Sequence, residues 1–331
     1  MRGTVMKVFD VLKKTAMKEK KTIVFPEGED KRILEAATRL ENEGVVSAIL
    51  LGNIDNIKTL AEKMDLDISK VKLIDPKAYP DFERLAEDLY KIRKDKNTFE
   101  QVKEMLCQET FFGTMLVYEK IADGMVSGAA HSTADTVRPA LQIVKTAKGM
   151  HRVSSSFIME RGDEKYIFAD CAINIDPDAE TLTEIAYQSA QTAKAVGIDP
   201  KIAFLSFSTK GSAKGEMIDK VVEATKLFNK KYPEIPADGE LQFDAAFVPS
   251  IGEAKAPGSK VAGHANVFIF PELQSGNIGY KIAQRLGNFS AVGPILQGLA
   301  EPINDLSRGC STQDVYDLAI VTAAQATRDD K

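Results

Sequence analysis

Residues 22–51 read TIVFPEGEDKRILEAATRLENEGVVSAILL and contain the pattern that decides the fold. Residues 22–25 are a short β-branched and aromatic run, residues 31–43 repeat apolar side chains at helical spacing, and residues 45–51 are a second apolar run. A strand, a helix and a strand in this order predict a βαβ unit, because two neighbouring parallel strands need a long crossover between them.

The same alternation continues along the chain and predicts an α/β fold with mainly parallel sheets. Further strands are expected at residues 71–74, 124–127, 153–159, 166–172, 201–207, 243–248, 267–270 and 291–296. Further helices are expected at residues 55–64, 81–94, 110–122, 134–146, 179–196, 216–230, 278–286 and 312–327. The strands at 153–159 and 166–172 flank a polar turn and predict an antiparallel hairpin that opens a second domain. Residues 249–263 are expected to be the longest loop without regular structure.

Composition bounds the class of protein. A chain of 331 residues suggests two domains, and 44% apolar with 27% charged residues is typical of a soluble globular protein. The net charge of −5 argues against a nucleic-acid partner, which requires a basic face. No apolar run is long enough to span a bilayer, and charges interrupt the first ten residues, so neither a membrane partner nor a signal peptide is expected. Three widely spaced cysteines, Cys107, Cys171 and Cys310, favour a reducing compartment and hence the cytoplasm.

Residues 302–314, PINDLSRGCSTQD, place several reactive groups just before an expected helix. Ser307 and Arg308 lie where backbone N–H groups, the helix dipole and a guanidinium could bind an anion, and Asp314 could serve as a base beside it. The spacing of Ser311 and Asp314 also fits a capping box, and the two roles could share one loop. Cys310 could be an acyl-accepting nucleophile or a small buried side chain.

Residues 128–138, GAAHSTADTVR, form a second loop that leads from an expected strand into a helix. Ser132 and Thr133 could bind phosphate oxygens or cap the helix. Arg138, one turn further, could reach the same anion or lie on the surface. A structural, hydrogen-bonded role is the more common one for a histidine such as His131, with catalysis as the alternative.

The loop at residues 206–215, SFSTKGSAKG, is rich in hydroxyls, glycine and lysine, so it could contact polyphosphate or pantetheine or be a solvated turn. It does not follow the order of a P-loop. No GxGxxG motif follows an early strand, which weakens the hypothesis of a dinucleotide-binding dehydrogenase. No HExxH or CxxC motif indicates a metal site.

Five blocks of this sequence resemble, in the same order, blocks of the phosphate acetyltransferase family. They are TIVFPEGEDKRIL at 22–34, AAHSTADTVRPALQ at 129–142, FADCAIN at 168–174, LSFSTKGSA at 205–213 and QGLAEPINDLSRGCS at 297–311. The resemblance runs along essentially the whole chain, whose length matches the short form of that family.

This resemblance implies two α/β domains with a cleft between them, as in isocitrate and isopropylmalate dehydrogenases. The first domain would comprise residues 1–148 and 298–331, and the second, residues 149–297, would form a homodimer. The implied reaction is the reversible conversion of acetyl-CoA and phosphate into acetyl phosphate and CoA by direct thiolate attack, in acetate and acetyl-CoA metabolism. CoA would be a substrate, and no cofactor is implied.

The resemblance also implies roles for individual residues. Arg308 would hold the phosphoryl group, Ser307 would stabilise the tetrahedral oxyanion, and Asp314 would accept the proton of the CoA thiol. Cys310 would lie in the site without being an obligatory nucleophile. Three further arginines match positions associated with substrate binding, namely Arg93, Arg138 and Arg285.

Three alternatives remain open from the sequence. A phosphate butyryltransferase would share the fold and the reaction logic, since one ethylene unit changes discrimination by only a few kcal/mol. A decarboxylating dehydrogenase of the same architecture would need nicotinamide and metal ligands that the sequence does not display. A non-catalytic regulator that binds CoA or an acyl phosphate would have no need for Ser307, Arg308 and Asp314 together.

Overall fold

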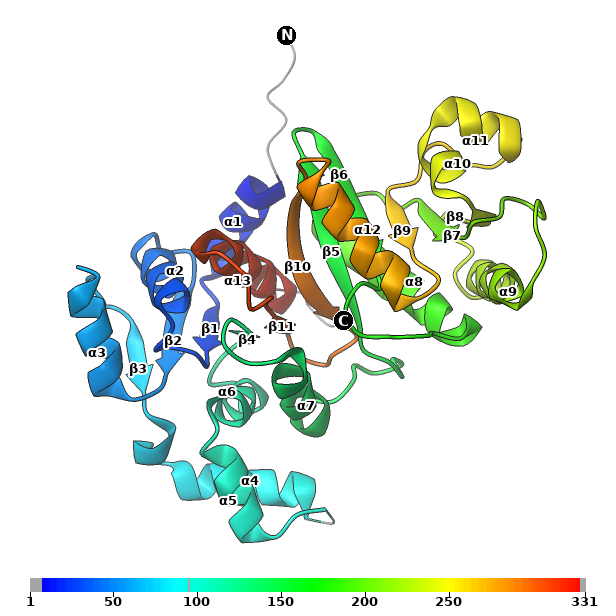
Figure 1. The fold of residues 1–331 in the computed structure, drawn as a ribbon. Coiled ribbons are helices and arrows are strands. Elements are labelled where there is room, and N and C mark those ends of the chain that lie inside the picture. Colours follow the sequence, from blue (N-terminus) through cyan, green and yellow to red (C-terminus); the bar gives the residue numbers. More distant parts are fainter. Residues whose placement is uncertain (1–7, 95, 328–331) are drawn as a thin grey trace. The chain divides into compact units, whose positions relative to one another are not determined.

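The computed structural model describes residues 8–94 and 96–327, which form two compact units (Figure 1). One unit, termed the split unit, combines residues 9–149 with residues 299–327. The other, termed the continuous unit, consists of residues 150–298. Each unit has its own sheet and its own apolar core.

The sheet of the split unit has the strand order β11-β4-β1-β2-β3, and every neighbouring pair is parallel. Its strands are β1 (Thr22–Phe25), β2 (Ser47–Leu51), β3 (Lys72–Ile74), β4 (Gly124–Ser127) and β11 (Ile303–Asp305). Because the strands share one direction, the carboxyl ends of β1, β4 and β11 lie side by side at the same end of the sheet.

Helices connect these strands and cover the sheet. They are α1 (Val8–Glu19), α2 (Lys31–Asn42), α3 (Ile54–Lys63), the 3₁₀ turn Pro76–Ala78, α4 (Phe82–Arg93), α5 (Phe99–Leu106), α6 (Glu109–Tyr118), α7 (Thr133–Ile143) and α13 (Thr312–Ala326). Val24 and Met125 from the sheet pack with Phe112 and Leu116 of α6 in a fully buried core. The burial of these apolar side chains stabilises both the short strands and the helices packed on them, and contributes more to the helices than their intrinsic propensity.

The sheet of the continuous unit has the order β10-β5-β6-β9-β7-β8. Its strands are β5 (Ser154–Arg161), β6 (Glu164–Ala169), β7 (Ile202–Leu205), β8 (Ala237–Leu241), β9 (Val267–Ile269) and β10 (Ser290–Gln297). The predicted hairpin is confirmed, since β5 and β6 are antiparallel neighbours. The β10–β5 pair is also antiparallel and the other pairs are parallel, so the predicted α/β fold with mainly parallel sheets is confirmed.

Five helices complete the described part of the continuous unit. They are α8 (Ala179–Ala195), α9 (Glu216–Lys231), α10 (Phe243–Phe247), α11 (Pro249–Lys255) and α12 (Leu273–Arg285). Aromatic rings dominate the core: Phe168 and Phe268 meet edge to face with their centroids 5.5 Å apart.

Two expectations for the continuous unit are wrong. Residues 243–248, expected to be a strand, begin with the helix α10. The rings of Phe243 and Phe247 stack with centroids 5.5 Å apart, because residues four apart share one face of a helix. Residues 249–263, expected to lack regular structure, begin with α11, in which Pro249 is the first helical residue, where its missing N–H is not needed.

Two short strands have no counterpart among the expected elements. β8 contains aspartate, glycine and glutamate and lies at the edge of its sheet. β11 has only three residues, Ile303–Asp305, two of them polar, and is held by parallel pairing with β4. Neither has the run of β-branched or apolar side chains that indicates a strand.

Candidate active site

Three loops of the split unit meet where parallel strands end. They follow β1, β4 and β11 and lead into α2, α7 and α13. In open parallel sheets ligands bind beyond the carboxyl ends of the strands, so these loops are the natural place for a site. Two of the three contain motifs that the sequence singled out, at residues 128–138 and 302–314.

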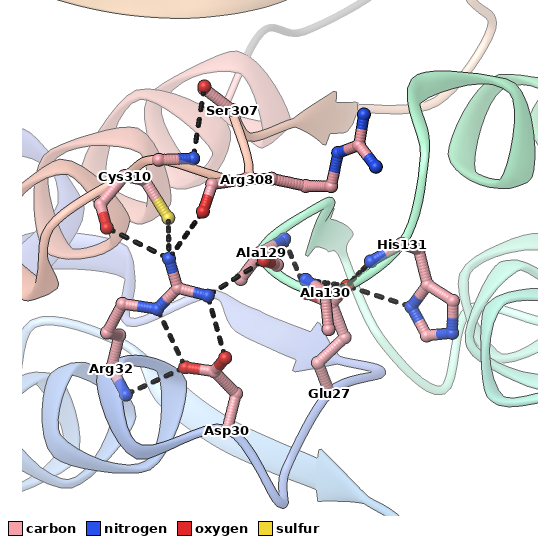
Figure 2. A network of polar contacts seen from close by, with 10 residues as sticks. Glu27, Asp30, Arg32, Ala129, Ala130, His131, Ser307, Arg308 and Cys310 are labelled. Atoms are coloured by element: carbon pink, nitrogen blue, oxygen red, sulfur yellow. Dashed lines mark hydrogen bonds and ion pairs between the residues drawn. The ribbon is translucent and has the colours of Figure 1, made fainter.

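The side chain of Arg32 joins all three loops (Figure 2). Its Nε and Nη2 donate to the two carboxylate oxygens of Asp30 at 3.0 and 2.7 Å. Nη2 also donates to the carbonyl of Ala129 at 2.7 Å, and Nη1 donates to the carbonyls of Arg308 and Cys310 at 2.8 and 3.0 Å. One guanidinium therefore fixes the relative positions of the β1, β4 and β11 loops.

The charges of Asp30 and Arg32 stabilise each other. The hydrogen bonds from Arg32 hold the pKa of Asp30 below its usual range, and those bonds in turn raise the pKa of Arg32. Both groups are therefore ionised throughout the neutral range. A bidentate pair between a guanidinium and a carboxylate is also geometrically specific, which suits a positioning role.

Glu27 makes a second connection between the β1 and β4 loops. Its side chain is 2% exposed and accepts from the backbone N–H groups of Ala129, Ala130 and His131 at 2.8–2.9 Å. Nδ1 of His131 lies 2.8 Å from Oε1 of the same carboxylate. Burial would raise the pKa of Glu27, but the hydrogen bonds from His131 and from the three amides outweigh it, and the pKa is lowered.

Ser307 and Arg308 lie on an exposed turn at the start of the β11 loop. Oγ of Ser307 accepts from the N–H of Gly309 at 3.3 Å, and the Ser307 carbonyl accepts from the N–H of Cys310 at 2.8 Å. Within residues 8–94 and 96–327, the guanidinium of Arg308 has no hydrogen-bond or ion-pair partner. Figure 2 shows this side chain extending away from Arg32, so its charge is available to an anion.

Asp314 is part of the capping box that the sequence offered as one alternative. Ser311 Oγ accepts from the N–H of Asp314, and Oδ2 of Asp314 accepts from the N–H and Oγ of Ser311 at 2.7 and 2.9 Å. The other oxygen, Oδ1, accepts from no donor in the described part of the chain. Capping therefore occupies one side of this carboxylate and leaves the other side open.

Cys310 is buried behind the same turn. Its Sγ lies 3.6 Å from Nη1 of Arg32, and burial raises the pKa of the thiol to about 11. Because the thiolate is the reactive form, this cysteine is a weak nucleophile at neutral pH. Of the two alternatives left open by the sequence, the geometry favours a small buried side chain.

The hydroxyls of Ser132 and Thr133 are both engaged within the protein. Ser132 caps α7 in a capping box with Asp135, and Oγ1 of Thr133 donates to Oδ2 of Asp305 at 2.6 Å. Among the described residues, the backbone N–H groups of Thr133 and Ala134 have no hydrogen-bond acceptor. An anion at this helix start would therefore meet free backbone N–H groups rather than free hydroxyls.

Asp305 has a buried carboxyl group that accepts the hydrogen bond from Thr133. Burial raises its pKa to about 6, and its Oδ1 has no hydrogen-bond partner within the described chain. Gly128, at a φ of +107°, passes so close that a Cβ atom there would lie 2.4 Å from this oxygen. A side chain at residue 128 would therefore push the β4 and β11 loops apart.

The three arginines implied by the resemblance lie in different places. Arg138 is exposed and lines a cavity of about 120 Å³ together with His131 and Asp135. Arg93 ends α4, where its Nε donates to the side chain of Asn97 at 3.1 Å. Arg285 ends α12 in the continuous unit and is exposed. The split unit thus brings Arg138 together with His131, while no hydrogen bond or ion pair joins Arg93 to the three loops within the described residues.

Glu27, Asp30, Arg32 and Asp305 are site residues that the sequence reasoning missed. All four lie inside the quoted blocks, but no residue-type pattern marks them as a group. The available signal for Glu27 and Asp30 was their position shortly after the expected strand at residues 22–25, at the end of a sheet where loops converge. Arg32 lies in the expected helix and Asp305 in a strand that was not expected, so no such signal marked them.

Two searches of the described residues were negative. No group of three or more histidine, cysteine, aspartate or glutamate side chains in that part of the chain could hold a metal ion. No helix among the described residues is both long and apolar enough to cross a bilayer.

Replacing Arg32 with lysine tests whether it holds the loops together. Arg32→Lys keeps the charge but loses the planar fork, so most of the bonds to Asp30 and the three carbonyls cannot form. We expect a loss of about 1–3 kcal/mol in the free energy of unfolding, from the unmade hydrogen bonds. We also expect faster amide hydrogen exchange in residues 128–131 and 306–311, measured by mass spectrometry.

Arg84→Lys is the matched control. Arg84 is exposed and, among residues 8–94 and 96–327, pairs only with Asp88 and Glu119, so its replacement should leave both measurements essentially unchanged. Unaltered exchange of the two loops in Arg32→Lys would show that they are held by other contacts.

Comparison with known proteins identifies the family. The model of the phosphate acetyl/butaryl transferase family matches residues 7–323. The phosphate acetyltransferase of Bacillus subtilis (strain 168) is 58% identical over 316 residues, which cover 96% of this chain and 98% of that protein. A phosphotransacetylase structure from Streptococcus pyogenes, 55% identical, superposes with a TM-score of 0.93 and covers 96% of this chain and 98% of its own.

A more distant likeness concerns the fold alone. A structure from Salmonella typhimurium that is named for a 4-hydroxythreonine-4-phosphate dehydrogenase is 13% identical and superposes with a TM-score of 0.55, covering 93% of this chain and 99% of its own. The expected similarity to a dehydrogenase architecture is therefore confirmed at the level of fold. The match to the family model and the high identity over nearly the full length lead to one conclusion: this chain belongs to the phosphate acetyl/butyryl transferase family.

Proposed function

We propose that this chain catalyses the reversible transfer of an acetyl group between CoA and inorganic phosphate. Identity of 58% over nearly the whole chain to a phosphate acetyltransferase supports acetyl over butyryl as the acyl group. The structural observation that carries the proposal is the exposed turn of Ser307 and Arg308, which ends four residues before the start of α13 and whose guanidinium has no partner among the described residues. That arrangement suits an oxyanion and a phosphate group in one place.

In this proposal Arg308 binds the phosphoryl group of acetyl phosphate. A guanidinium can contact two phosphate oxygens at once, and it neutralises charge on phosphate as the acyl bond breaks. Arg32 is occupied by Asp30 and by three carbonyls, so it positions Arg308 instead of competing for the ligand. The hydroxyl of Ser307 donates a hydrogen bond to the oxyanion of the tetrahedral intermediate.

Asp314 accepts the proton of the CoA thiol in this scheme. An aspartate in water has a pKa of about 3.9 and a thiol one of about 8.5, so the transfer costs roughly 6 kcal/mol without further help. The cationic side chain of Arg308, six residues earlier, lowers this cost by stabilising the forming thiolate. Oδ1 of Asp314, which capping leaves open, is the acceptor atom.

The predicted arginines outside the Ser307–Arg308 turn would make the other contacts with the substrates. Arg138, with the N-terminal amides of α7 at Thr133, lies next to His131 in the split unit and would bind phosphate. Arg93 and Arg285 would bind other charged groups of the substrates, which are CoA, acetyl-CoA, phosphate and acetyl phosphate. We propose no cofactor besides CoA as a substrate. The three cysteines are all free thiols, which supports a cytoplasmic location.

We further propose that the protein is a homodimer formed through the continuous unit. Helix α12 and its C-cap residue expose Ile278, Ile282 and Leu286, at 56%, 52% and 82%, and these residues lie four apart. That spacing puts them on one face of the helix. A second copy of the chain would cover this apolar stripe, as expected for a homodimer interface.

The activity is tested by following thiol release from acetyl-CoA in the presence of phosphate. The wild-type protein should release thiol with acetyl-CoA and far more slowly with butyryl-CoA. Arg308→Lys should lower kcat/KM by about 100-fold or more, because the bidentate contact with phosphate is lost. Arg84→Lys should behave as wild type. Equal rates with the two acyl groups, or full activity in Arg308→Lys, would contradict the corresponding part of the proposal.

The dimer is tested by sedimentation velocity of Ile282→Asp. A carboxylate in the middle of the stripe should convert the dimer into a monomer, because it would be buried without a partner. Met217→Asp, which alters an exposed apolar residue of α9, is the control and should remain dimeric. A wild-type monomer, or an unchanged dimer in Ile282→Asp, would rule out this interface.

A further inference from the structure

The proposed reaction requires two groups that handle protons, and the scheme above names only one. When CoA attacks acetyl phosphate, the new C–S bond forms and the C–O bond to phosphate breaks. The thiol proton goes to Asp314, but the departing oxygen would leave as trianionic phosphate unless it receives a proton. Departure as hydrogen phosphate therefore needs a proton donor beside the bridging oxygen. This inference rests on the proposed function.

The pair of Glu27 and His131 has the geometry of a held imidazole. Glu27 is almost fully buried and fixed by three backbone N–H groups, so it cannot turn away from the ring. With this carboxylate ionised, Nδ1 of His131 carries a proton and donates it to Oε1 at 2.8 Å. The nitrogen that gains and loses a proton is then Nε2, as in other carboxylate–histidine pairs.

The ring of His131 is open on its other side. Its side chain is 37% exposed, and Figure 2 shows the ring reaching out from Glu27 with its second nitrogen directed away from that carboxylate. His131 lines the cavity of about 120 Å³ that also contains Arg138, Asp135 and Glu109. His131 therefore borders a polar space where the cation of Arg138 can hold phosphate.

The backbone places this imidazole close to the phosphate-binding turn. Arg32 donates to the carbonyl of Ala129, two residues before His131, and to the carbonyl of Arg308. His131 also directly precedes Ser132, the N-cap of α7, and the N–H groups at the start of that helix have no acceptor among the described residues. Phosphate bound between Arg308 and the start of α7 would thus have the imidazole as a neighbour.

We propose that His131 donates the proton at Nε2 to the departing phosphate oxygen, and that Glu27 positions it for this step. The step balances: Asp314 gains the thiol proton, His131 loses one, and acetyl-CoA and hydrogen phosphate are formed. Solvent exchange then restores both groups. In the reverse reaction His131 accepts the proton of hydrogen phosphate as phosphate attacks acetyl-CoA.

The surrounding charges favour the protonated ring that a donor requires. The hydrogen bond to Glu27 raises the pKa of His131, and Glu109 at the start of α6 and Asp135 on α7 act in the same direction. Arg138 on α7 is the cation that shares this cavity and opposes them. A raised pKa increases the fraction of rings that carry a proton on Nε2, and that proton is lost as pH rises through the pKa.

The kinetic test is the pH profile of kcat/KM for acetyl phosphate at saturating CoA. The wild-type value should fall as pH rises through the pKa of His131. In His131→Gln kcat at pH 7 should fall by about 100-fold or more, the range of general acid catalysis, while KM for acetyl phosphate changes by at most about threefold. The alkaline decline should disappear in this variant. His264→Gln, an exposed histidine of the continuous unit, is the control and should keep the wild-type profile.

A measurement on the wild-type protein covers the case in which His131→Gln does not fold. The chain has three histidines, so ¹⁵N NMR can follow each ring separately. With CoA bound, His131 should be the Nδ1–H tautomer when neutral and should titrate above the usual value of about 6.5, in agreement with the kinetic decline. A neutral Nε2–H tautomer, or titration below that value, would overturn the proposal.

The outcomes separate this inference from the proposed function. If wild-type protein releases no thiol from acetyl-CoA with phosphate, the proposed function fails whatever the state of His131. If wild-type protein is active but His131→Gln keeps the alkaline decline, or loses the same factor at every pH, His131 has only a structural role and this inference alone is wrong.

Discussion

The guanidinium of Arg32 is the contact on which the candidate site depends. Three loops follow three parallel strands, and loops of this kind have few contacts of their own to fix their spacing. Arg32 supplies donors to a carboxylate in its own loop and to carbonyls in the other two. Only arginine offers a planar set of donors that can serve several acceptors in fixed directions at once.

Arg32 positions the loops, whereas Arg308 offers its charge to a ligand. Its charge is compensated by Asp30, so it adds little free positive charge to the site. The charge of Arg308 has no such compensation within the described residues, although its carbonyl is held by Arg32. Glu27 has a similar positioning role, because it fixes the β4 loop through three backbone N–H groups and orients the ring of His131. Rigid supports of this kind let exposed side chains act from defined positions.

The sequence predicted the layered α/β fold because its signals are local. The bounds of β1 and β4 agree with prediction, since β-branched or apolar runs end there at proline or glycine. The capping box of Ser311 and Asp314 was also visible, because its partners are three residues apart. The strand expected at residues 243–248 was wrong because a short, mostly apolar segment such as FDAAFV fits a short helix as well as a strand.

The support of the site could not be predicted in the same way. Arg32 contacts residues 276 and 278 positions away, and it contacts them through carbonyl groups, which every residue has. No residue type therefore signals the contact. Asp305 and Thr133 pose the same problem, since their bond depends on the pairing of β11 with β4.

A double-mutant cycle between Arg32 and Arg308 tests the central claim most directly. The quantity to measure is kcat/KM for acetyl phosphate in wild type, Arg32→Lys, Arg308→Lys and the double variant. If Arg32 acts by positioning Arg308, Arg32→Lys should lower kcat/KM strongly in the wild-type background and only slightly when residue 308 is already lysine. Equal fold losses in both backgrounds would mean that the two arginines act independently and would contradict the account.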